Sequence, residues 1–529
     1  MVTAQNLMKF GFFPKEIPPA FSSESFGSLQ ADPSFISSGA LVAPNNQGRL
    51  SQVREGYSNL CRHNLARLDG SNRRLQIPHP VHYFELSQII ETNWAFIDQH
   101  LSDDRISLSI PKIDTNNSRA IISNKSGTYR PEKRLQDRAQ GNVLLVVDVA
   151  NFYGTIYTHS IPWALHTKRV AKNDRTDRLF GNYIDKIIRN SQDGQTIGIP
   201  IGTDISFLVA EIILAYIDKE IQNKFPDLVG FRFFDDYEFV VSKEEDARQL
   251  LASIEDLLEE YELSINQRKS KIIALPDSVE QIWFSELRNN SRLLNGIRPM
   301  QLRDQFIDYV NLSFELASRY PNDPVLRYSL ALLTKINLRN IWTLYQNFLI
   351  QVFREEPQVA SYVSSELLSY ESKGCTIDIE LIKKSIYDQV VYYSSRKSSN
   401  EISWCIWLAI LFSINIDDKV AANLTSSQDN FVALLTLHAR SKGLITNLDT
   451  SEWGLKIAQN SIYSCDWLLA YEAATKGWLP IIDGSDYINA HPCFGQFHIR
   501  SISFYDENSY ENHASVLTKL KNKPDIYST

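Results

Sequence analysis

The sequence predicts an α+β fold with an antiparallel sheet, followed by an all-helical C-terminal region. Between about residues 105 and 274, strand-like segments alternate with helix-like segments. The strand-like segments are rich in β-branched and aromatic residues, and the helix-like ones repeat apolar residues every three or four positions. After about residue 295 strand signals become few and helix-like segments dominate. We expect the helices of the first part to cover one face of the sheet.

The elements follow in chain order. Residues 1–46 are rich in Pro, Ser, Phe and Gly, and we expect an irregular arm there. The run NVLLVVDV from Asn142 predicts a buried strand, and the run DISFLVAEIILAYIDKEI from Asp204 predicts a helix. Another helix is expected after Ser242, which has capping-box spacing with Glu245. The chain therefore divides into an N-terminal arm, a mixed domain and a helical domain: 1–46, 47–295 and 296–529.

The helical domain shows no clean repeat period. Stacked helices are expected there, and a HEAT-like solenoid is one arrangement of them. Its longest apolar run, ISWCIWLAILFSINI from Ile402, is shorter than the roughly 18–20 residues that span a bilayer. We expect a buried helix and no membrane association. The N-terminus also lacks the pattern of a signal peptide.

Charge and cysteine content narrow the classes of protein to which the chain could belong. The formal net charge is -8, which argues against a protein coated with nucleic-acid-binding charge but leaves room for a local basic channel. Two stretches are locally basic: one from Gly48 to Leu75 with six arginines and no lysine, and one that begins at Arg119. The five cysteines form no CxxC pair, which indicates a reducing cytoplasm.

Carboxylates in an apolar setting give the first functional signal. Asp235 and Asp236 lie inside the run GFRFFDDYEFVV, where charge is costly unless a cation meets it. Asp148 ends the strand-like run LLVVD, and a hairpin that carries Asp235 and Asp236 at its tip can lie beside that strand. Three carboxylates would then converge. Two divalent cations held about 3.5–4 Å apart by carboxylates are the apparatus of phosphoryl transfer. A turn that merely carries two acids is the structural alternative.

Several segments resemble the motifs of reverse transcriptases, in the expected order. IPKIDTNNSRAII from Ile110 resembles the fingers motif, and VVDVANFYGTIYTHSIPWALH from Val146 resembles motif A. GIPIGTDISFLVAEI from Gly198 resembles motif B, FRFFDDY motif C, and LSINQRKSKI motif D. The resemblance implies the fingers and palm of a right-hand polymerase. It also implies two Mg²⁺ or Mn²⁺ ions and dNTP substrates.

The segments GFFPKEIPPAF, LQIPHPVHYFELSQIIETNW and YGTIYTHSIPWALH resemble the abortive-infection (Abi) reverse transcriptases of bacterial phage defence, above all the prophage-borne ones. The likeness covers about the first 290 residues, and the rest matches only in being helical. It implies a cytoplasmic bacterial enzyme with a helical domain in place of the usual thumb. It further implies template-independent, protein-primed synthesis of single-stranded DNA, covalent attachment of the product, a homo-oligomer such as a trimer or hexamer, and a phage-encoded trigger.

The resemblance assigns roles to individual residues. Asp148, Asp235 and Asp236 are the expected catalytic and metal-binding residues. Tyr153, five residues after Asp148, falls where the family places the residue that lies beneath the sugar of the incoming nucleotide. The bulk of its ring would exclude a 2′-hydroxyl. The alternative is that Tyr153 is a core aromatic residue. Lys112 and Arg119 fall in the fingers pattern that holds the triphosphate, where cationic donors suit phosphate. The alternative for both is a solvated face.

Motifs B and D carry the remaining expected dNTP contacts, Gly202, Ser206 and Lys269, with Lys271 as the alternative to Lys269. Motif B reads Pro-Ile-Gly where the family at large has Pro-Gln-Gly, a departure that Abi members share. For priming, Tyr57 is the candidate side chain, beside Ser or Thr hydroxyls of the arm. Two other functions stay open: a template-dependent, retron-like enzyme with an RNA partner, and an idle nucleic-acid-binding scaffold. Aromatic side chains of the helical domain are further candidates for stacking on bases: Trp342, Tyr345, Trp404 and Trp407.

Overall fold

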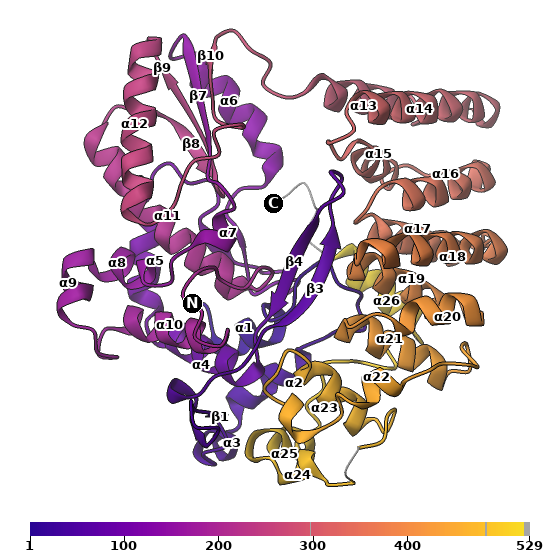
Figure 1. Ribbon diagram of the computed structural model, residues 1–529. Helices are drawn as coiled ribbons and strands as arrows, with labels where there is room; N and C mark the ends of the chain where they lie inside the picture. Colours follow the sequence, from indigo (N-terminus) through magenta and orange to yellow (C-terminus); the bar gives the residue numbers. More distant parts are fainter. Residues whose placement is uncertain (297, 482–483, 523–529) are drawn as a thin grey trace.

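The computed structural model describes residues 1–296, 298–481 and 484–522 (Figure 1). Its centre is a four-stranded antiparallel sheet in the order β10-β7-β9-β8. The expected strand after Asn142 is confirmed as β7. The four strands have these bounds: β7 (Val143–Asp148), β8 (Val229–Phe233), β9 (Asp236–Val241) and β10 (Lys271–Ala274).

The two faces of this sheet have different neighbours. Tyr237 and Phe239 of β9 are buried in the main core, where α12 (Glu244–Glu260) packs on β7 and β9 and α11 (Asp204–Lys224) packs on α12. Both helices are confirmed, but the expected capping box is not formed, because the N-cap of α12 is Lys243 and no side chain caps the helix start. Glu238, between those two aromatic residues, binds arginines of α6 (Arg130–Arg138) instead. Helices therefore lie on both faces, and the expectation of a single covered face is wrong for α6 (Figure 1).

The remaining elements of residues 47–295 surround the sheet. The β3–β4 hairpin, Cys61–Ala66 and Asn72–Ile77, lies between the sheet and the C-terminal helices in Figure 1. A short hairpin of β5 and β6 carries the fingers motif. The other bounds are β2 (Leu50–Gln52), η2 (Val53–Glu55), α4 (Pro80–Thr92), α5 (Trp94–Ser102), β5 (Pro111–Ile113), β6 (Ile121–Ser123), η3 (Gly127–Tyr129), α7 (Phe152–Thr155), α8 (Ser160–His166), α9 (Lys168–Asn173) and α10 (Phe180–Asn190).

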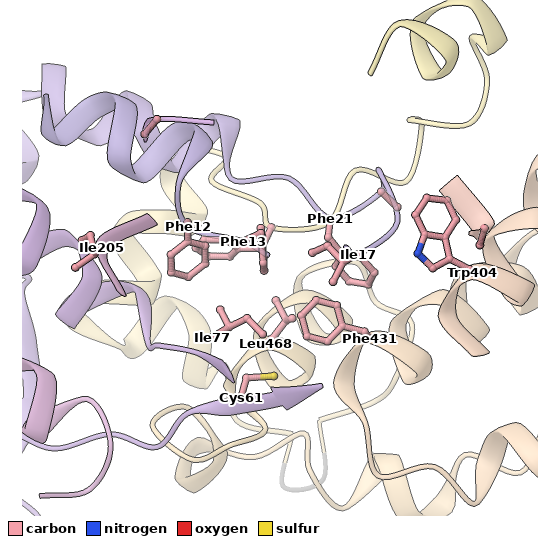
Figure 2. Packing of buried hydrophobic residues seen from close by; sticks show 14 of the residues in the cluster. Phe12, Phe13, Ile17, Phe21, Cys61, Ile77, Ile205, Trp404, Phe431 and Leu468 are labelled. Atoms are coloured by element: carbon pink, nitrogen blue, oxygen red, sulfur yellow. The ribbon is translucent and has the colours of Figure 1, made fainter. Parts of the chain in front are cut away.

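The N-terminal segment is not an irregular arm. Its aromatic residues are buried, and Phe12 packs edge-on against Phe13 and Tyr83 while Phe21 lies 4.5 Å from Phe431 between ring centroids (Figure 2). The prediction weighed Pro and Ser and overlooked how much apolar surface the phenylalanines would bury. The ordered elements are α1 (Ala4–Phe10), α2 (Glu24–Gly27), η1 (Ser28–Ala31), α3 (Pro33–Ser37) and β1 (Val42–Pro44).

Every described helix or strand after Ala274 is a helix, as predicted for residues 296–529, and successive helices pack as stacked pairs in Figure 1. Helix α13, before the predicted division at 295/296, packs on α14 and α15. The bounds are α13 (Ile282–Arg292), α14 (Pro299–Arg319), α15 (Val325–Leu333), η4 (Arg339–Ile341), α16 (Trp342–Glu355), α17 (Ala360–Glu371), α18 (Ile379–Arg396), α19 (Ser399–Leu411), α20 (Asp418–Thr425), α21 (Asn430–Ser441), α22 (Ser451–Gly454), η5 (Gln459–Ser461), α23 (Trp467–Thr475), α24 (Tyr487–Ala490), α25 (Pro492–Ile499) and α26 (His513–Lys521).

The C-terminal helices and the N-terminal segment share one core. Phe12, Phe26 and Trp467 all pack against Phe504, so residues from both ends of the chain fill the same space. The apolar run from Ile402 lies in α19, whose residues are all buried, as expected. Within the described ranges, no helix combines the length and the hydropathy that crossing a bilayer requires.

Candidate active site

A cleft of 2140 Å³ opens between the four-stranded sheet and the C-terminal helices. On one side it is lined by the ends of β7 and β9, the loop before α11 and the β3–β4 hairpin; on the other side it is lined by α17 and its neighbours. The side chains of Asp148, Asp235 and Asp236 all face this cleft. The three acids that the sequence singled out therefore lie in one concave site.

Two strands bring these carboxylates together. Asp148, the last residue of β7, is the register partner of Asp236 on β9, and the Val149 N–H donates to the Asp235 carbonyl at 3.2 Å. The hairpin tip between β8 and β9 is a tight turn, because Phe234 has φ +53°. Ser109 Oγ accepts from the Phe234 N–H at 2.9 Å and fixes this strained tip.

The charges of the site are only partly compensated. Burial raises the pKa of Asp235, and the nearby Asp148 carboxylate raises it further. Burial likewise raises the pKa of Asp236 to about 6, although Arg130, 3.4 Å away, opposes this. Lys269 Nζ lies 2.9 Å from Asp148 Oδ2, and this hydrogen bond raises the pKa of the lysine. A cation thus already sits against the carboxylate of Asp148.

The carboxylate oxygens of the site are the type of ligand that divalent cations such as Mg²⁺ prefer. Asp148 and Asp235 offer oxygen ligands in a site where carboxylates repel each other. Asp236 faces Arg130, and across residues 1–296, 298–481 and 484–522 no group of three or more His, Cys, Asp or Glu side chains is arranged to hold a metal ion. Mg²⁺ is commonly held by one or two carboxylates plus substrate phosphates. The metal-ligand role of Asp148 and Asp235 stays a prediction that this arrangement suits, and that of Asp236 stays a prediction as well, with Arg130 as a competing partner of its carboxylate.

Tyr153 lies in the cleft beside the acids. It belongs to α7, which follows the left-handed Asn151 (φ 43°), and its carbonyl accepts from the Ile199 N–H at 3.0 Å. The side chain is half-buried, its ring packs edge-on against buried Phe152, and burial raises its pKa. Its phenol lies close enough to Asp235 for that charge to raise the pKa further. A ring in this position can limit the space under a bound sugar.

The two fingers cations differ. Lys112 of β5 is exposed and lines the cleft, as a triphosphate-binding lysine would. Arg119 is buried instead: its Nε donates to Asp204 Oδ1 at 2.8 Å and its Nη1 donates to the Phe13 carbonyl at 2.5 Å. The Arg119 guanidinium therefore joins the fingers hairpin to α11 and to the N-terminal segment. The solvated face that the sequence left open does not describe it, whereas its triphosphate contact stays a prediction, because Arg119 also lines the cleft.

Motif B forms a tight turn before α11. Gly202 has φ +119°, and a Cβ there would approach Pro14 Cγ to 2.6 Å, so a side chain is excluded. Ser206 is buried, and its Oγ lies 2.9 Å from Thr203 Oγ1, the N-cap of α11. Ser206 thus supports the helix start, and the expectation that it contacts dNTP is not met by its side chain.

Residues 92–295 match the family model for reverse transcriptase (RNA-dependent DNA polymerase). The chain contains a reverse transcriptase domain. Residues Asp148, Asp235 and Asp236 all fall within it. This domain is a nucleotidyltransferase of the polymerase class.

Two solved structures of telomerase match this chain with low identity and low TM-scores. A telomerase from Candida albicans in complex with a TWJ fragment of telomeric RNA has 12% identity and a TM-score of 0.29, over 69% of this chain and 66% of that one. The apo telomerase from Candida tropicalis has 10% identity and a TM-score of 0.31, over 84% and 77%. The chain thus spans 66% of the first telomerase. Comparison with curated proteins found no match.

The priming and stacking candidates lie away from the cleft or in the core. Tyr57 is not among the side chains that line the cleft, and its ring lies against Gly194. Of the helical-domain aromatics, Trp342 donates to the Thr376 carbonyl and Trp404 to the Glu16 carbonyl, each at 2.8 Å. All four candidates are buried, which favours the core over base stacking, although Trp404 also contributes to the cleft lining: Trp342, Tyr345, Trp404 and Trp407.

Sequence reasoning missed two arginines that support the reverse transcriptase domain. Arg232, fully buried in β8, binds Asp104, Glu211 and Asp218, and its Nη1 donates to the Phe234 carbonyl at the catalytic hairpin tip. Arg130 of α6 holds Asp236 and Glu238. A charged residue inside the apolar run GFRFF was the available signal for Arg232, because a cation is rarely buried without partners.

Proposed function

We propose that the chain is a DNA polymerase of the reverse transcriptase family that acts in anti-phage defence and synthesises DNA from dNTPs, primed by the protein and without a template. The observation that carries the polymerase part is the pair Asp148 and Asp235, held at adjacent strand ends in a large cleft with Lys269 beside them. The defence role, the priming and the template independence rest on the Abi-like motifs of the sequence.

Each cleft residue has a defined task in this proposal. Asp148 and Asp235 would hold the divalent ions, which lower the pKa of the attacking hydroxyl and stabilise the leaving pyrophosphate. Lys112 presents an ammonium group to the triphosphate. Lys269 is released from Asp148 when substrate arrives and donates a proton or positive charge to pyrophosphate. Tyr153 limits the space beneath the sugar.

The partners follow from the same proposal. The product is single-stranded DNA attached to the protein, the assembly is a homo-oligomer, and a phage-encoded component triggers activity. The isoleucine in the Pro-Ile-Gly loop supports template independence, since Ile201 lacks the side-chain amide that a glutamine would offer to a template base. The net charge of -8 also disfavours a long duplex.

The priming hydroxyl has to reach the site of Asp148 and Asp235. Tyr57 lies outside the cleft, and Val2, Leu7 and Phe12 of the N-terminal segment are buried in the core. The far wall of the cleft, in contrast, carries hydroxyl groups along α17, so these side chains are alternative candidates: Ser361, Tyr362, Ser365 and Ser369.

A labelling experiment tests the proposal. Nuclease-treated full-length protein is incubated with Mg²⁺ or Mn²⁺ and one labelled dNTP. We expect label that stays on the polypeptide through boiling in detergent and is removed by DNase. Mass spectrometry of the nucleotide-bearing peptide then separates Tyr57 from the α17 hydroxyls.

The same experiment distinguishes the other two functions. Labelling that needs an added primer–template and yields free complementary DNA supports a template-dependent, retron-like enzyme. Incorporation that never exceeds that of an Asp148→Asn variant, under either metal and with either substrate, supports an idle scaffold.

The sugar gate gives a separate prediction. Tyr153→Ala should admit ribonucleotides and narrow the preference for dNTPs by about 10- to 200-fold, the usual range for steric selection in a pocket. The readout is the ratio of kcat/KM for a dNTP to that for the matching rNTP. Tyr153→Phe is the control, because it keeps the ring and should keep the preference. An active Tyr153→Ala enzyme with the wild-type ratio would place the gate elsewhere.

A further inference from the structure

The β3–β4 hairpin reaches into the cleft between the reverse transcriptase domain and the C-terminal helices (Figure 1). Arg73 pairs with Leu65 in the antiparallel register, and Arg67 follows two residues after Leu65. The two arginines therefore lie on the same face of the hairpin, since strand side chains alternate. Both of them line the cleft.

Most other cations near the catalytic acids are already paired. Arg119 is held by Asp204, Arg130 by Asp236 and Glu238, and Lys269 by Asp148. By contrast, the part of the chain that the structure describes offers no ion pair or side-chain hydrogen bond to Arg67 or Arg73. The nearby carboxylate of Asp69 is turned toward Ser71, which donates to it from both Oγ and N.

The two arginines are also close to each other. Partial desolvation and the positive charge of Arg73 together lower the pKa of Arg67. Asp69 offsets part of this repulsion but, within the described residues, forms no ion pair with Arg67, and two neighbouring guanidinium groups that repel each other favour a shared anion. Guanidinium groups match phosphate oxygens with paired N–H donors.

The position of Arg73 indicates which phosphate it meets. Arg73 lines the same cleft as the Asp235 carboxylate and the Tyr153 side chain, so its guanidinium faces the space in which the reacting phosphates would lie. Farther along β4, the Gln76 N–H donates to the carbonyl of Ile201 in the motif B loop at 2.9 Å. From this contact at the motif B loop, the hairpin runs along the cleft to its tip, where Arg67 lies. This path suits the backbone of a nucleic-acid strand.

The C-terminal helices fix this hairpin in place. Asn64 and Asn72 donate to the Lys397 and Arg396 carbonyls at 3.0 and 2.9 Å. Gln358 Nε2 donates to the Ala66 carbonyl at 2.7 Å, and the Ala66 N–H donates to Glu401 Oε2 at 3.1 Å. These bonds hold both strands beside the arginines, so the two guanidinium groups are presented from a rigid support.

We propose that Arg67 and Arg73 form a phosphate clamp that binds the backbone of the growing single-stranded nucleic acid next to Asp235. The clamp deepens the proposed polymerase function and rests on it for the identity of the strand. It also gives the helical domain a task, which is to position the hairpin.

Binding of a single strand in the absence of dNTP tests the clamp without catalysis. Nuclease-treated full-length protein is titrated against a fluorescein-labelled oligo(dT) between about 50 and 200 mM NaCl. Each arginine changed to alanine should lower the slope of log K against log salt by about 0.7, the value for one phosphate contact to a single strand. Arg67→Ala/Arg73→Ala should therefore lose about 1.4 of that slope.

Matched variants separate a contact from a structural effect. Arg74→Ala, on the opposite face of β4 and outside the cleft lining, should leave the slope unchanged. Arg67→Lys/Arg73→Lys should restore most of the slope lost by the alanine pair, because the charges return. Melting temperatures of all variants should match the wild type.

Two results would overturn the clamp. One is a wild-type salt slope for the double alanine variant. The other is unchanged oligo(dT) binding together with a raised KM for dNTP, which would assign the arginines to the incoming triphosphate. The Asp235→Asn variant distinguishes a failure of the clamp from a failure of the proposed polymerase function. It should bind oligo(dT) like the wild type. If it still incorporates dNTP, the proposed polymerase site is wrong, whatever the two arginines bind.

Discussion

Asp235→Asn should lose nucleotide incorporation by roughly a thousandfold or more, which corresponds to several kcal/mol of transition-state stabilisation. Asp235 is one of the two carboxylates placed to hold the divalent ions, and asparagine keeps its shape while removing the charge. The measurement is the initial rate of labelled dATP incorporation with Mg²⁺ or Mn²⁺.

The fold should survive this change. Burial and the neighbouring Asp148 carboxylate raise the pKa of Asp235, so its charged form is unfavourable in the folded protein, and its removal should not lower the free energy of unfolding. Asp256→Asn is the matched control, since Asp256 is an exposed carboxylate of α12 away from the cleft. Near wild-type activity of Asp235→Asn would mean that the acidic cluster is not the catalytic site.

Arg232→Met should cost about 3–5 kcal/mol of unfolding free energy, the usual penalty for removing one partner of a buried ion cluster. Arg232 is fully buried, and its Nε lies 2.6 Å from Asp218 Oδ2 while its Nη1 lies 2.9 Å from Glu211 Oε1. Without the guanidinium, these carboxylates and Asp104 would face one another in the core. Chemical denaturation monitored by circular dichroism gives the free energy.

The loss of unfolding free energy caused by Arg232→Met should become smaller as the pH falls from about 8 to about 5. Burial already raises the pKa values of Glu211 and Asp218, with Arg232 opposing the rise. In the variant they rise further, so the folded state binds more protons than the unfolded state, and stability falls with increasing pH. Arg248→Met serves as control, because Arg248 is exposed and pairs with the exposed Glu244 on the same helix. A deficit that is small, or that grows on acidification, would show that the cluster is not held by charge.

Local sequence features predicted the catalytic half of the protein well. Asp148 closes a β-branched run, and Asp235 and Asp236 separate two apolar runs by one short turn, so strand pairing alone brings them close. The apolar periodicity after Asp204 and Ser242 predicted α11 and α12 for the same reason. The all-helical character of the C-terminal region also followed from composition and periodicity.

The sequence by itself thus determined the element types of the sheet and of the C-terminal region, the order of the motifs and the meeting of Asp148 with Asp235. Tertiary structure alone decided which charged groups are free. Arg119 is neutralised by Asp204, 85 positions away in the sequence, whereas Arg67 and Arg73 are held open to the cleft by helices more than 280 residues further along the chain. Periodicity reports only how neighbouring residues share a face. The partner of a charge depends on which distant elements pack together, and that is set by the burial of the whole core.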